Sequence, residues 1–389
     1  SLVSVGNSAL YVDGNSESLS RTLSGAGTSR KTFTLGGWFY KTKVGSGSDC
    51  RIFQWDNGTL NDDRGMILID NTTPDAIKLL IEDASNVATM IWTSTQLLRD
   101  QAWYHWCLTV DTTPATPIFM FFLNGIEITA WTKSTDDLAQ DDVFAIADSG
   151  SRHAWGADSE LNQGYLDGYM AECFYLDGQV ITDITDVVDI STDGLYVTPK
   201  SNTAMKALTF GDEGYYLDNA TNAQTDASGN GNNFTNNNTV TLSTHTPTNS
   251  SALFNPLYVN NANVALSNGN RTMAANGAVN EMKIATLAIP PNSGKWYFDL
   301  SWDTWVDGYD DGYLGLVSEE LIESAGLSSP TTDSNQWSIY ITASIIIKLG
   351  DASYVDTTQT FNQIGDIFQV AYDSDTGKLF LGYYDASAT

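Results

Sequence analysis

The chain has 389 residues, enough for two or three domains with full-sized hydrophobic cores. Tyr, Trp, Phe, Thr, Gly and Asn are plentiful and helical Leu/Ala periodicity is scarce, so the composition favours an all-β fold. The formal net charge is −29 with only 18 Lys plus Arg. This excess of negative charge argues against binding to nucleic acid through a basic patch and against binding to anionic membranes. The apolar runs are far shorter than the roughly 20 residues of a spanning helix.

Strand patterns separated by turn residues recur along the first part of the chain. Their short and regular spacing is typical of a β-sandwich. The predicted strands cover residues 8–13, 18–23, 32–43, 50–55, 65–70, 76–82 and 87–92.

The stretch from Trp103 to Trp131 predicts the centre of this sandwich. Residues 103–111 alternate with one apolar face, and residues 118–123 are apolar on both faces. Asn124-Gly125 between two strand patterns is a strong hairpin signal, because both residues tolerate positive φ. The free energy gained by burying this apolar run nearly equals the conformational entropy lost on ordering its backbone, so the hairpin alone would be marginally stable. It therefore needs a second sheet to cover it.

A polar segment with paired aspartates, residues 132–151, precedes a last strong strand pattern, residues 164–182. ALYVDG near the N-terminus, TFTLGGWFYK, WYHWCLTVD, FFLNGIEI and GYMAECFYLDGQVIT follow one another in the order found in laminin-G-like, concanavalin A-like jelly rolls. Residues 1–210 therefore resemble that family. The resemblance implies two antiparallel sheets packed face to face.

Residues 211–250 are rich in Asn, Thr, Gly and Ser and predict a connector. Residues 251–389 then resemble a SPRY domain through SGKWYFDL, GYLGLV and GDIFQVAYD, with KLFLG at the position of that family's next hairpin. The closing strands of the SPRY family have no counterpart, so this domain is expected to be incomplete. The resulting fold class is all-β, with two antiparallel β-sandwich (jelly-roll) domains joined by the connector.

This arrangement, in an acidic chain, resembles fibre, spike or capsid-attached proteins of marine tailed bacteriophages. The resemblance implies a virion-surface protein, assembled in the host cytoplasm, with host cell-surface glycans and other virion proteins as partners. A homo-oligomer is expected, with a trimer favoured by the phage resemblance, although no heptad or collagen repeat enforces one. Two alternatives stay open: a purely structural decoration or scaffold protein without a glycan ligand, and, less favoured, a polysaccharide-degrading enzyme.

The residues give little sign of catalysis. The carboxylate pair of a retaining glycosidase has no counterpart as a Glu-x-Asp-x-x-Glu string, and Glu172 stands alone on its strand. His105 alternates with apolar residues and is expected at a surface or against a second sheet. No nucleophile elbow, P-loop or GxGxxG motif occurs.

The three cysteines, Cys50, Cys107 and Cys173, are far apart, lack a CxxC motif and predict neither disulfides nor a metal site. Cys107 and Cys173 are expected to be buried thiols, which fits a reducing cytoplasm, and no signal peptide is expected.

No cofactor is certain, and calcium is the candidate ion because clustered carboxylates suit it. Solvated acidic loops are the simpler interpretation of the same aspartates. The candidate ligands lie in two acidic loops: Asp141 and Asp142, and Asp307, Asp310 and Asp311.

Aromatic residues beside these two loops predict sugar-binding platforms, because a sugar needs an apolar ring to stack on and polar groups for its hydroxyls. Edge plugs or subunit contacts are the alternative role. The candidate carbohydrate-binding residues are Trp131 and Trp155 in the first domain and Trp305 and Tyr309 in the second.

Overall fold

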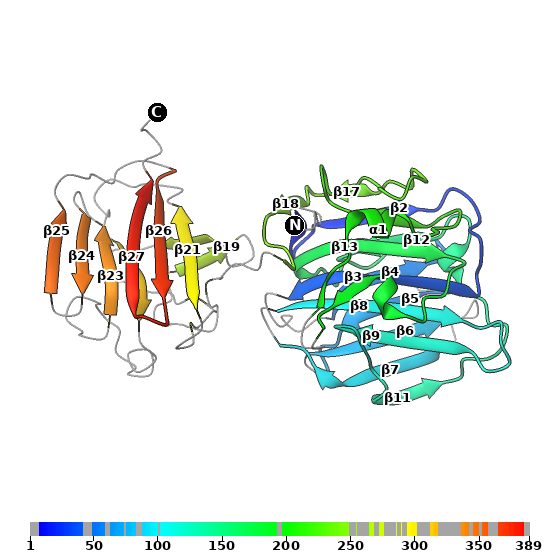
Figure 1. Cartoon of the computed structure of the whole chain (residues 1–389). Helices are drawn as coiled ribbons and strands as arrows, with labels where there is room; N and C mark the ends of the chain where they lie inside the picture. Colours follow the sequence, from blue (N-terminus) through cyan, green and yellow to red (C-terminus); the bar gives the residue numbers. More distant parts are fainter. Residues whose placement is uncertain are drawn as a thin grey trace. The chain divides into compact units, whose positions relative to one another are not determined.

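The structure is a computed structural model. It describes residues 8–41, 49–58, 63–73, 75–82, 88–99, 102–192, 197–248, 254, 264–267, 272–275, 285, 289, 294–301, 312–317, 336–341, 345–349, 352–356 and 365–384. The chain divides into two compact units, Ser1–Ser250 and Ser251–Thr389. Both are built from antiparallel strands, as the sequence predicts (Figure 1). No helix in the described ranges is long and apolar enough to cross a membrane.

The first unit contains two large antiparallel sheets, A and B. Sheet A runs in the order β10-β9-β8-β3-β13-β1-β18, with β16 pairing β13. Its strands are β1 (Ala9–Asp13), β3 (Thr32–Lys41), β8 (Trp103–Asp111), β9 (Ile118–Leu123), β10 (Ile126–Glu127), β13 (Asp167–Asp177), β16 (Tyr215–Leu217) and β18 (Thr241–Ser243).

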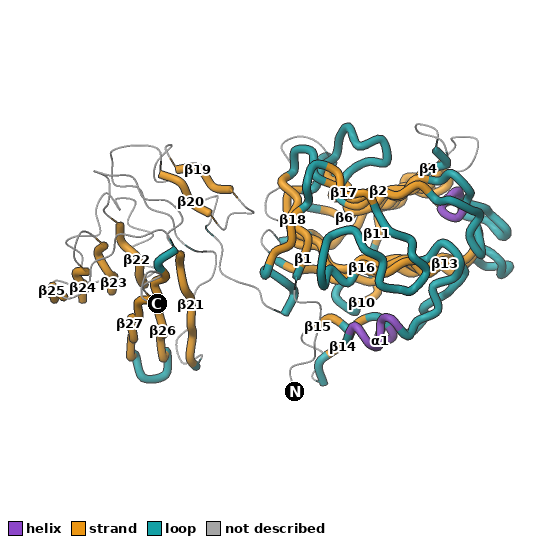
Figure 2. Tube along the Cα trace, turned by 90° about the horizontal axis from the view of Figure 1, so that it is seen from above, coloured by secondary structure: helices purple, strands orange, loops and turns teal. Residues whose placement is uncertain are grey.

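Sheet B runs in the order β11-β7-β6-β5-β4-β12-β2-β17. Its strands are β2 (Ser18–Thr22), β4 (Cys50–Asp56), β5 (Gly65–Ile69), β6 (Ala76–Glu82), β7 (Ala88–Leu97), β11 (Trp131–Asp136), β12 (Arg152–Trp155) and β17 (Thr235–Asn237). Seen along the sandwich, the strands of the two sheets form two layers (Figure 2).

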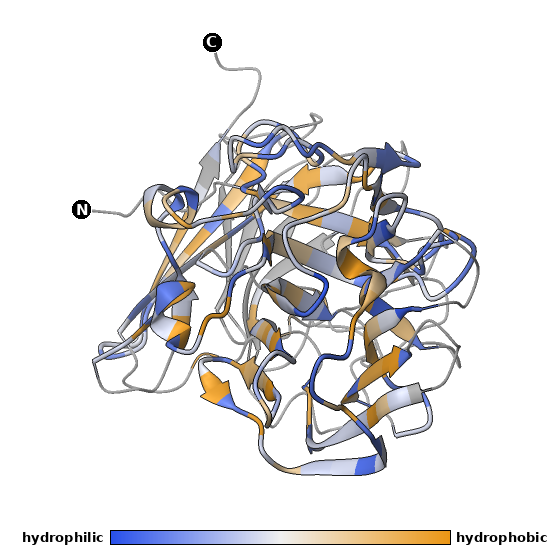
Figure 3. Cartoon of the chain, turned by 90° about the vertical axis from the view of Figure 1, so that its right-hand side faces the viewer, coloured by the Kyte–Doolittle hydropathy of each residue, from blue (hydrophilic) through white to orange (hydrophobic). Residues whose placement is uncertain are grey.

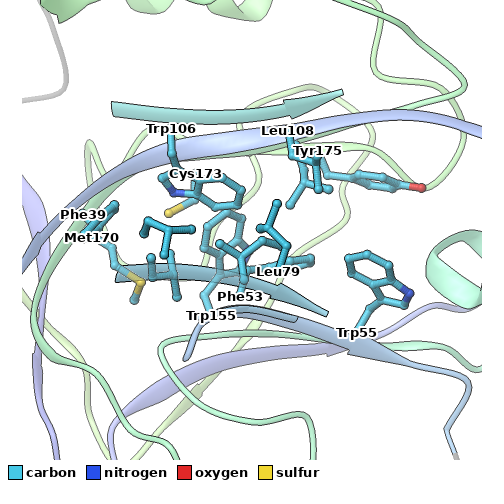
Figure 4. Packing of buried hydrophobic residues seen from close by; sticks show 14 of the residues in the cluster. Phe39, Phe53, Trp55, Leu79, Trp106, Leu108, Trp155, Met170, Cys173 and Tyr175 are labelled. Atoms are coloured by element: carbon cyan, nitrogen blue, oxygen red, sulfur yellow. The ribbon is translucent and has the colours of Figure 1, made fainter. Parts of the chain in front are cut away.

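The core lies between the two sheets. Alternate residues of β8, including Trp106 and Leu108, meet Phe53 and Leu79 from sheet B in one continuous apolar cluster (Figure 4). Figure 3 shows hydrophobic residues along stretches of the strands and hydrophilic residues in many of the connecting loops. Burial of these large side chains, at about 1.5–3 kcal/mol each, is the main force that holds the sheets together.

The predicted hairpin is confirmed. β9 and β10 pair around Asn124 and Gly125, which have φ of 49° and 75°. The Asn124 carboxamide also accepts a hydrogen bond from the backbone N–H of His105 on β8, at 2.9 Å. The turn at Asn124 and Gly125 therefore fixes the register of β9 with β10, and the hydrogen bond of Asn124 ties this turn to β8.

The connector interpretation of residues 211–250 is wrong, because the segment belongs to the first sandwich. β16 pairs with β13 and β18 with β1 in sheet A, and β17 pairs with β2 in sheet B. Tyr215 and Phe234 from this segment lie in the core. Because the segment is mostly polar, its sequence did not indicate that it supplies an edge strand to each sheet.

A third layer covers the outer face of sheet A. It contains η2 (Ile184–Asp186), the hairpin of β14 (Val188–Ile190) and β15 (Val197–Pro199), and the short helix α1 (Asn202–Lys206). Thr34 and Thr109 anchor it by donating hydrogen bonds to the carbonyl oxygens of Gln179 and Ile181. His105 is buried with its ring against Trp38, so of its two expected positions the surface one is wrong. Cys107 and Cys173 are buried free thiols, as predicted.

Glu172 is a structural residue under this layer. It sits in a bulge of β13 with φ of 54°, and it accepts a hydrogen bond from the buried Tyr216 hydroxyl. Replacing Glu172 with Ala is expected to lower the free energy of unfolding by about 1–3 kcal/mol, because a buried hydroxyl loses an acceptor. Urea denaturation measures the loss. Glu172→Gln keeps an acceptor and should lose less, whereas an alanine variant as stable as wild type would contradict this role.

The second unit contains three separate antiparallel sheets in its described parts. They are the pair β19 (Val264–Ser267) and β20 (Thr272–Ala275), the three strands β21 (Lys295–Ser301), β26 (Ile367–Asp373) and β27 (Lys378–Tyr384), and the four strands β22 (Gly312–Val317), β23 (Gln336–Ile341), β24 (Ile345–Leu349) and β25 (Ala352–Asp356). The segments singled out for their SPRY resemblance fall on β21, β22, β26 and β27.

Candidate functional site

The predicted tryptophan platforms of the first unit do not form a sugar site. Trp155 on β12 has no exposed surface, and its indole N–H donates to the Tyr215 hydroxyl at 3.1 Å. Since a sugar cannot reach it, the prediction for Trp155 is wrong. A tryptophan beside an acidic loop is equally compatible with a core position, and here the short strand β12 turns it inward.

Trp131 is half-buried at the edge of the core. Its ring packs against Trp92 and Phe121, and its indole N–H donates to the carbonyl oxygen of Ile128 at 2.7 Å. These contacts use the face and the polar edge of the ring to close the end of the sandwich. Trp131 therefore acts as an edge plug, the alternative that the sequence left open. Trp305 and Tyr309 lie outside the described residues.

The two predicted calcium ligands of the first unit, Asp141 and Asp142, make local structural contacts. Asp141 pairs with Lys31 at 2.9 Å, and the Asp142 carboxylate accepts the backbone N–H of Ala139 at 2.7 Å. The two carboxylates have different partners and are not part of a cluster: among the described residues no group of three His, Cys, Asp or Glu could hold a metal ion. Asp307, Asp310 and Asp311 lie outside those residues.

An exposed aromatic face stands out on the sheet β21-β26-β27 of the second unit, whose three strands lie side by side in Figure 1. Three rings are more than half exposed: Tyr297 on β21 (58%), and Phe380 (59%) and Tyr384 (54%) on β27. We call these three residues the aromatic face. Aromatic side chains of this size are usually covered, so three on one sheet face mark a contact surface.

Strand register puts the three rings on one side of the sheet. Tyr297 pairs with Ala371, which pairs with Phe380, so the first two rings flank one small residue. Tyr384 follows Phe380 by four residues and thus points the same way. The other side of the sheet carries the buried Phe368 and Val370, which fixes the aromatic face outward.

Polar groups lie between the rings. Asp299 pairs with Gln369, and Gln369 pairs with Gly382, in the row next to Tyr297 and Phe380. The Tyr297 hydroxyl donates to the Asp299 carboxylate at 3.1 Å. Desolvation and the nearby Asp299 charge raise the pKa of Tyr297, so its hydroxyl stays protonated at neutral pH. The face thus combines apolar ring surfaces with carboxylate, amide and hydroxyl groups.

Charged residues border the face at one end. Lys295 pairs with Asp373, and Asp373 pairs with Lys378, in the row beyond Tyr297 and Phe380. Desolvation raises the pKa of Asp373, but hydrogen bonds from Thr376 and from backbone N–H groups outweigh it and lower that pKa. Asp373 therefore stays ionised as the cap of the β26–β27 turn. The adjacent Asp375 similarly accepts the N–H of Gly294 at 3.1 Å.

Sequence reasoning missed the aromatic face. Residues 295–300 read Lys-Trp-Tyr-Phe-Asp-Leu, so aromatic residues occupy both faces of the strand pattern and alternation does not show which face is exposed. The usable signal was Gly382 between Phe380 and Tyr384, because a glycine in a strand often marks a close approach by another group.

Comparisons with known proteins find distant structural likenesses. No family model matches the sequence, and no curated protein matches it. Among solved structures the chain is similar to a putative carbohydrate-binding protein from Bacteroides ovatus, with TM-score 0.41, 17% identity, and coverage of 61% of this chain and 60% of that chain. It is also similar to a heptameric SAP-like pentraxin from Limulus polyphemus, with TM-score 0.37, 12% identity, and coverage of 62% and 96%.

The tailspike protein 2 of bacteriophage CBA120 gives TM-score 0.31 and 14% identity over 41% of this chain and 23% of that chain. These likenesses are distant in both sequence and backbone. They carry no argument about what the chain binds, so the function has to be argued from the exposed site itself.

Proposed function

We propose that the chain is a carbohydrate-binding protein whose second unit holds a glycan on the aromatic face. The observation that carries the proposal is three exposed rings on one sheet face with Asp299 and Gln369 between them. The C–H faces of a pyranose stack on aromatic rings, and its hydroxyls need nearby carboxylate and amide groups. The aromatic face offers both.

We further propose that this binding serves a virion-surface protein, a tail fibre, spike or capsid-attached fibre, in adsorption to host glycans. Its support is the order of β-sandwich motifs in an acidic chain with 47 Asp plus Glu. Binding to other virion proteins, a trimeric state and a requirement for calcium stay predictions. A purely structural role is the alternative, in which the aromatic face contacts another protein and binds no sugar.

Replacing Tyr297 or Phe380 with Ala is expected to weaken glycan binding by about tenfold each, the loss expected for one interface residue worth about 1.4 kcal/mol. A glycan array identifies the ligand and isothermal titration gives the affinities. Ile126→Ala is the matched control, because Ile126 is 71% exposed and lies in the first unit.

Circular dichroism of each variant shows whether it is folded. Folded Tyr297 and Phe380 variants that bind as wild type would show that the aromatic face is not the site. If the wild-type protein binds neither array glycans nor host cells, the carbohydrate-binding function itself is wrong, and the structural alternative takes its place.

A further inference from the structure

The three rings of the aromatic face are too far apart for one sugar. Phe380 and Tyr384 are four residues apart on one strand, roughly 13 Å at about 3.3 Å per residue. Tyr297 and Phe380 are two strands apart, roughly 10 Å at about 4.8 Å per strand. Because a pyranose ring is about as wide as one phenyl ring, each aromatic ring would have to stack on a different sugar.

The spaces between the rings have small residues as their floor. Ala371 lies between Tyr297 and Phe380, and Gly382 lies between Phe380 and Tyr384. A Cβ added at Gly382 would come within 3.0 Å of the Gln369 side-chain oxygen. The glycine thus leaves room for the Gln369 side chain to lie between Phe380 and Tyr384 on β27, so that a sugar chain could contact Phe380, Gln369 and Tyr384 in turn.

Charge favours a neutral chain over an acidic one. Lys295 and Lys378 at the border of the aromatic face are matched by the carboxylates of Asp299, Asp373 and Asp375. The whole chain carries a formal charge of −29, which repels a polyanion at low ionic strength.

We infer that the aromatic face binds an extended stretch of a neutral polysaccharide, with three or more sugar units in contact, and does not recognise a single or terminal sugar. The inference rests on the proposed carbohydrate-binding function and names its ligand class. It follows from the separation of the rings and from the small residues between them, because several weak stacking contacts on one chain add up through effective concentration.

The test is an array that carries neutral oligosaccharides of one to six units, including glucan, mannan, galactan and xylan series, beside uronic-acid oligomers of equal lengths. The expected result is binding that begins near three units and is at least about 100-fold tighter for a hexasaccharide than for a monosaccharide. Neutral series should bind more tightly than acidic ones of the same length, most clearly at low salt.

Gly382→Val tests this arrangement, because the added side chain would displace the Gln369 side chain from its place between Phe380 and Tyr384 and would keep all three rings. Valine suits an exposed strand, and the Gln369 side chain that it meets is flexible at its end. Hexasaccharide binding should fall about tenfold or more in Gly382→Val and stay unchanged in Ile126→Ala.

The outcomes separate the two proposals. Equal binding of monosaccharides and hexasaccharides, or a preference for uronic-acid chains, would overturn this inference and leave the carbohydrate-binding function in place. Hexasaccharide binding that Gly382→Val leaves unchanged would also overturn it. If no carbohydrate binds, both proposals are wrong.

Discussion

Glu213→Ala should lower the free energy of unfolding of the first unit by about 3–5 kcal/mol, because it leaves a buried guanidinium without its carboxylate. Glu213 and Arg21 form an ion pair in which each side chain is 6% exposed. The other Glu213 oxygen accepts the backbone N–H of Gly25 at 2.9 Å, so alanine removes that hydrogen bond too.

The pair also joins two distant parts of the chain. Arg21 lies on β2, whereas Glu213 and Asn232 lie in the segment 211–250, and Arg21 donates to the Asn232 side-chain oxygen at 2.6 Å. Breaking the pair should therefore loosen the contact of that segment with sheet B, and protection of the β2–β17 backbone amides from hydrogen exchange should fall with stability.

Urea denaturation followed by tryptophan fluorescence measures the effect. Asp141→Ala is the matched control: its ion pair with Lys31 is more than a third exposed on both sides, and such pairs contribute about 0–1 kcal/mol. The double variant Arg21→Met with Glu213→Leu should recover much of the loss, since no charge remains buried. A Glu213→Ala variant within about 1 kcal/mol of wild type would contradict this account.

The strands of the first unit were predictable where apolar residues alternate. The pattern of residues 103–111 and 118–123 reproduces β8 and β9 with the same bounds. Strand β11 was missed because Trp131–Asp136 is a mostly exposed edge strand, whose residues lack an apolar face to bury. Alternation of apolar residues records burial of one strand face, so a strand with both faces mostly exposed, such as β11, gives no such pattern.

Residues 211–250 were predicted as a connector because the side chains that hold this segment in place are polar. The Asp226 carboxylate accepts N–H groups of Tyr216, Ser228 and Asn232, and the Asn230 and Asn232 amides donate to backbone carbonyl oxygens. These bonds order a chain that contains few apolar residues. Composition alone does not distinguish such a segment from a solvated linker.

The candidate site was less predictable than the fold. Exposure decides whether an aromatic residue binds a ligand, and exposure depends on which sheet covers which face. The sequence predicted Trp155 as a sugar-binding residue and did not single out Tyr297, yet Trp155 is fully buried and Tyr297 is more than half exposed. Only the strand register reveals that Tyr297, Phe380 and Tyr384 share one face.

Acidification from pH 7 to pH 5 should destabilise the first unit, because burial keeps the imidazoles of His105 and His153 in the neutral form. Burial lowers the pKa of His105 to about 3, and within the described part of the chain neither ring nitrogen of His105 has a hydrogen-bond partner. Burial also lowers the pKa of His153 to about 3, although a hydrogen bond with the Ile146 carbonyl opposes the shift.

The sign of the effect follows from proton uptake. Below the ordinary histidine pKa of 6.5 the unfolded chain binds a proton on each histidine, and the folded chain does not do so until about pH 3. Stability is therefore complete above pH 6.5 and falls through the window between 6.5 and 3, by up to about 1.4 kcal/mol per pH unit for each histidine. Between pH 7 and 5 the two together should cost on the order of 3–4 kcal/mol.

His105→Phe isolates one histidine, because the substitution keeps a planar ring against Trp38 and gives up no ring hydrogen bond. Urea denaturation at pH 7 and pH 5 should show a loss for the variant that is smaller than the wild-type loss by about 2 kcal/mol. Carboxylates titrate alike in both proteins, so their contribution cancels in the difference. Parallel losses in wild type and His105→Phe would mean that His105 becomes protonated without unfolding, and the buried neutral imidazole would then not be the source of acid sensitivity.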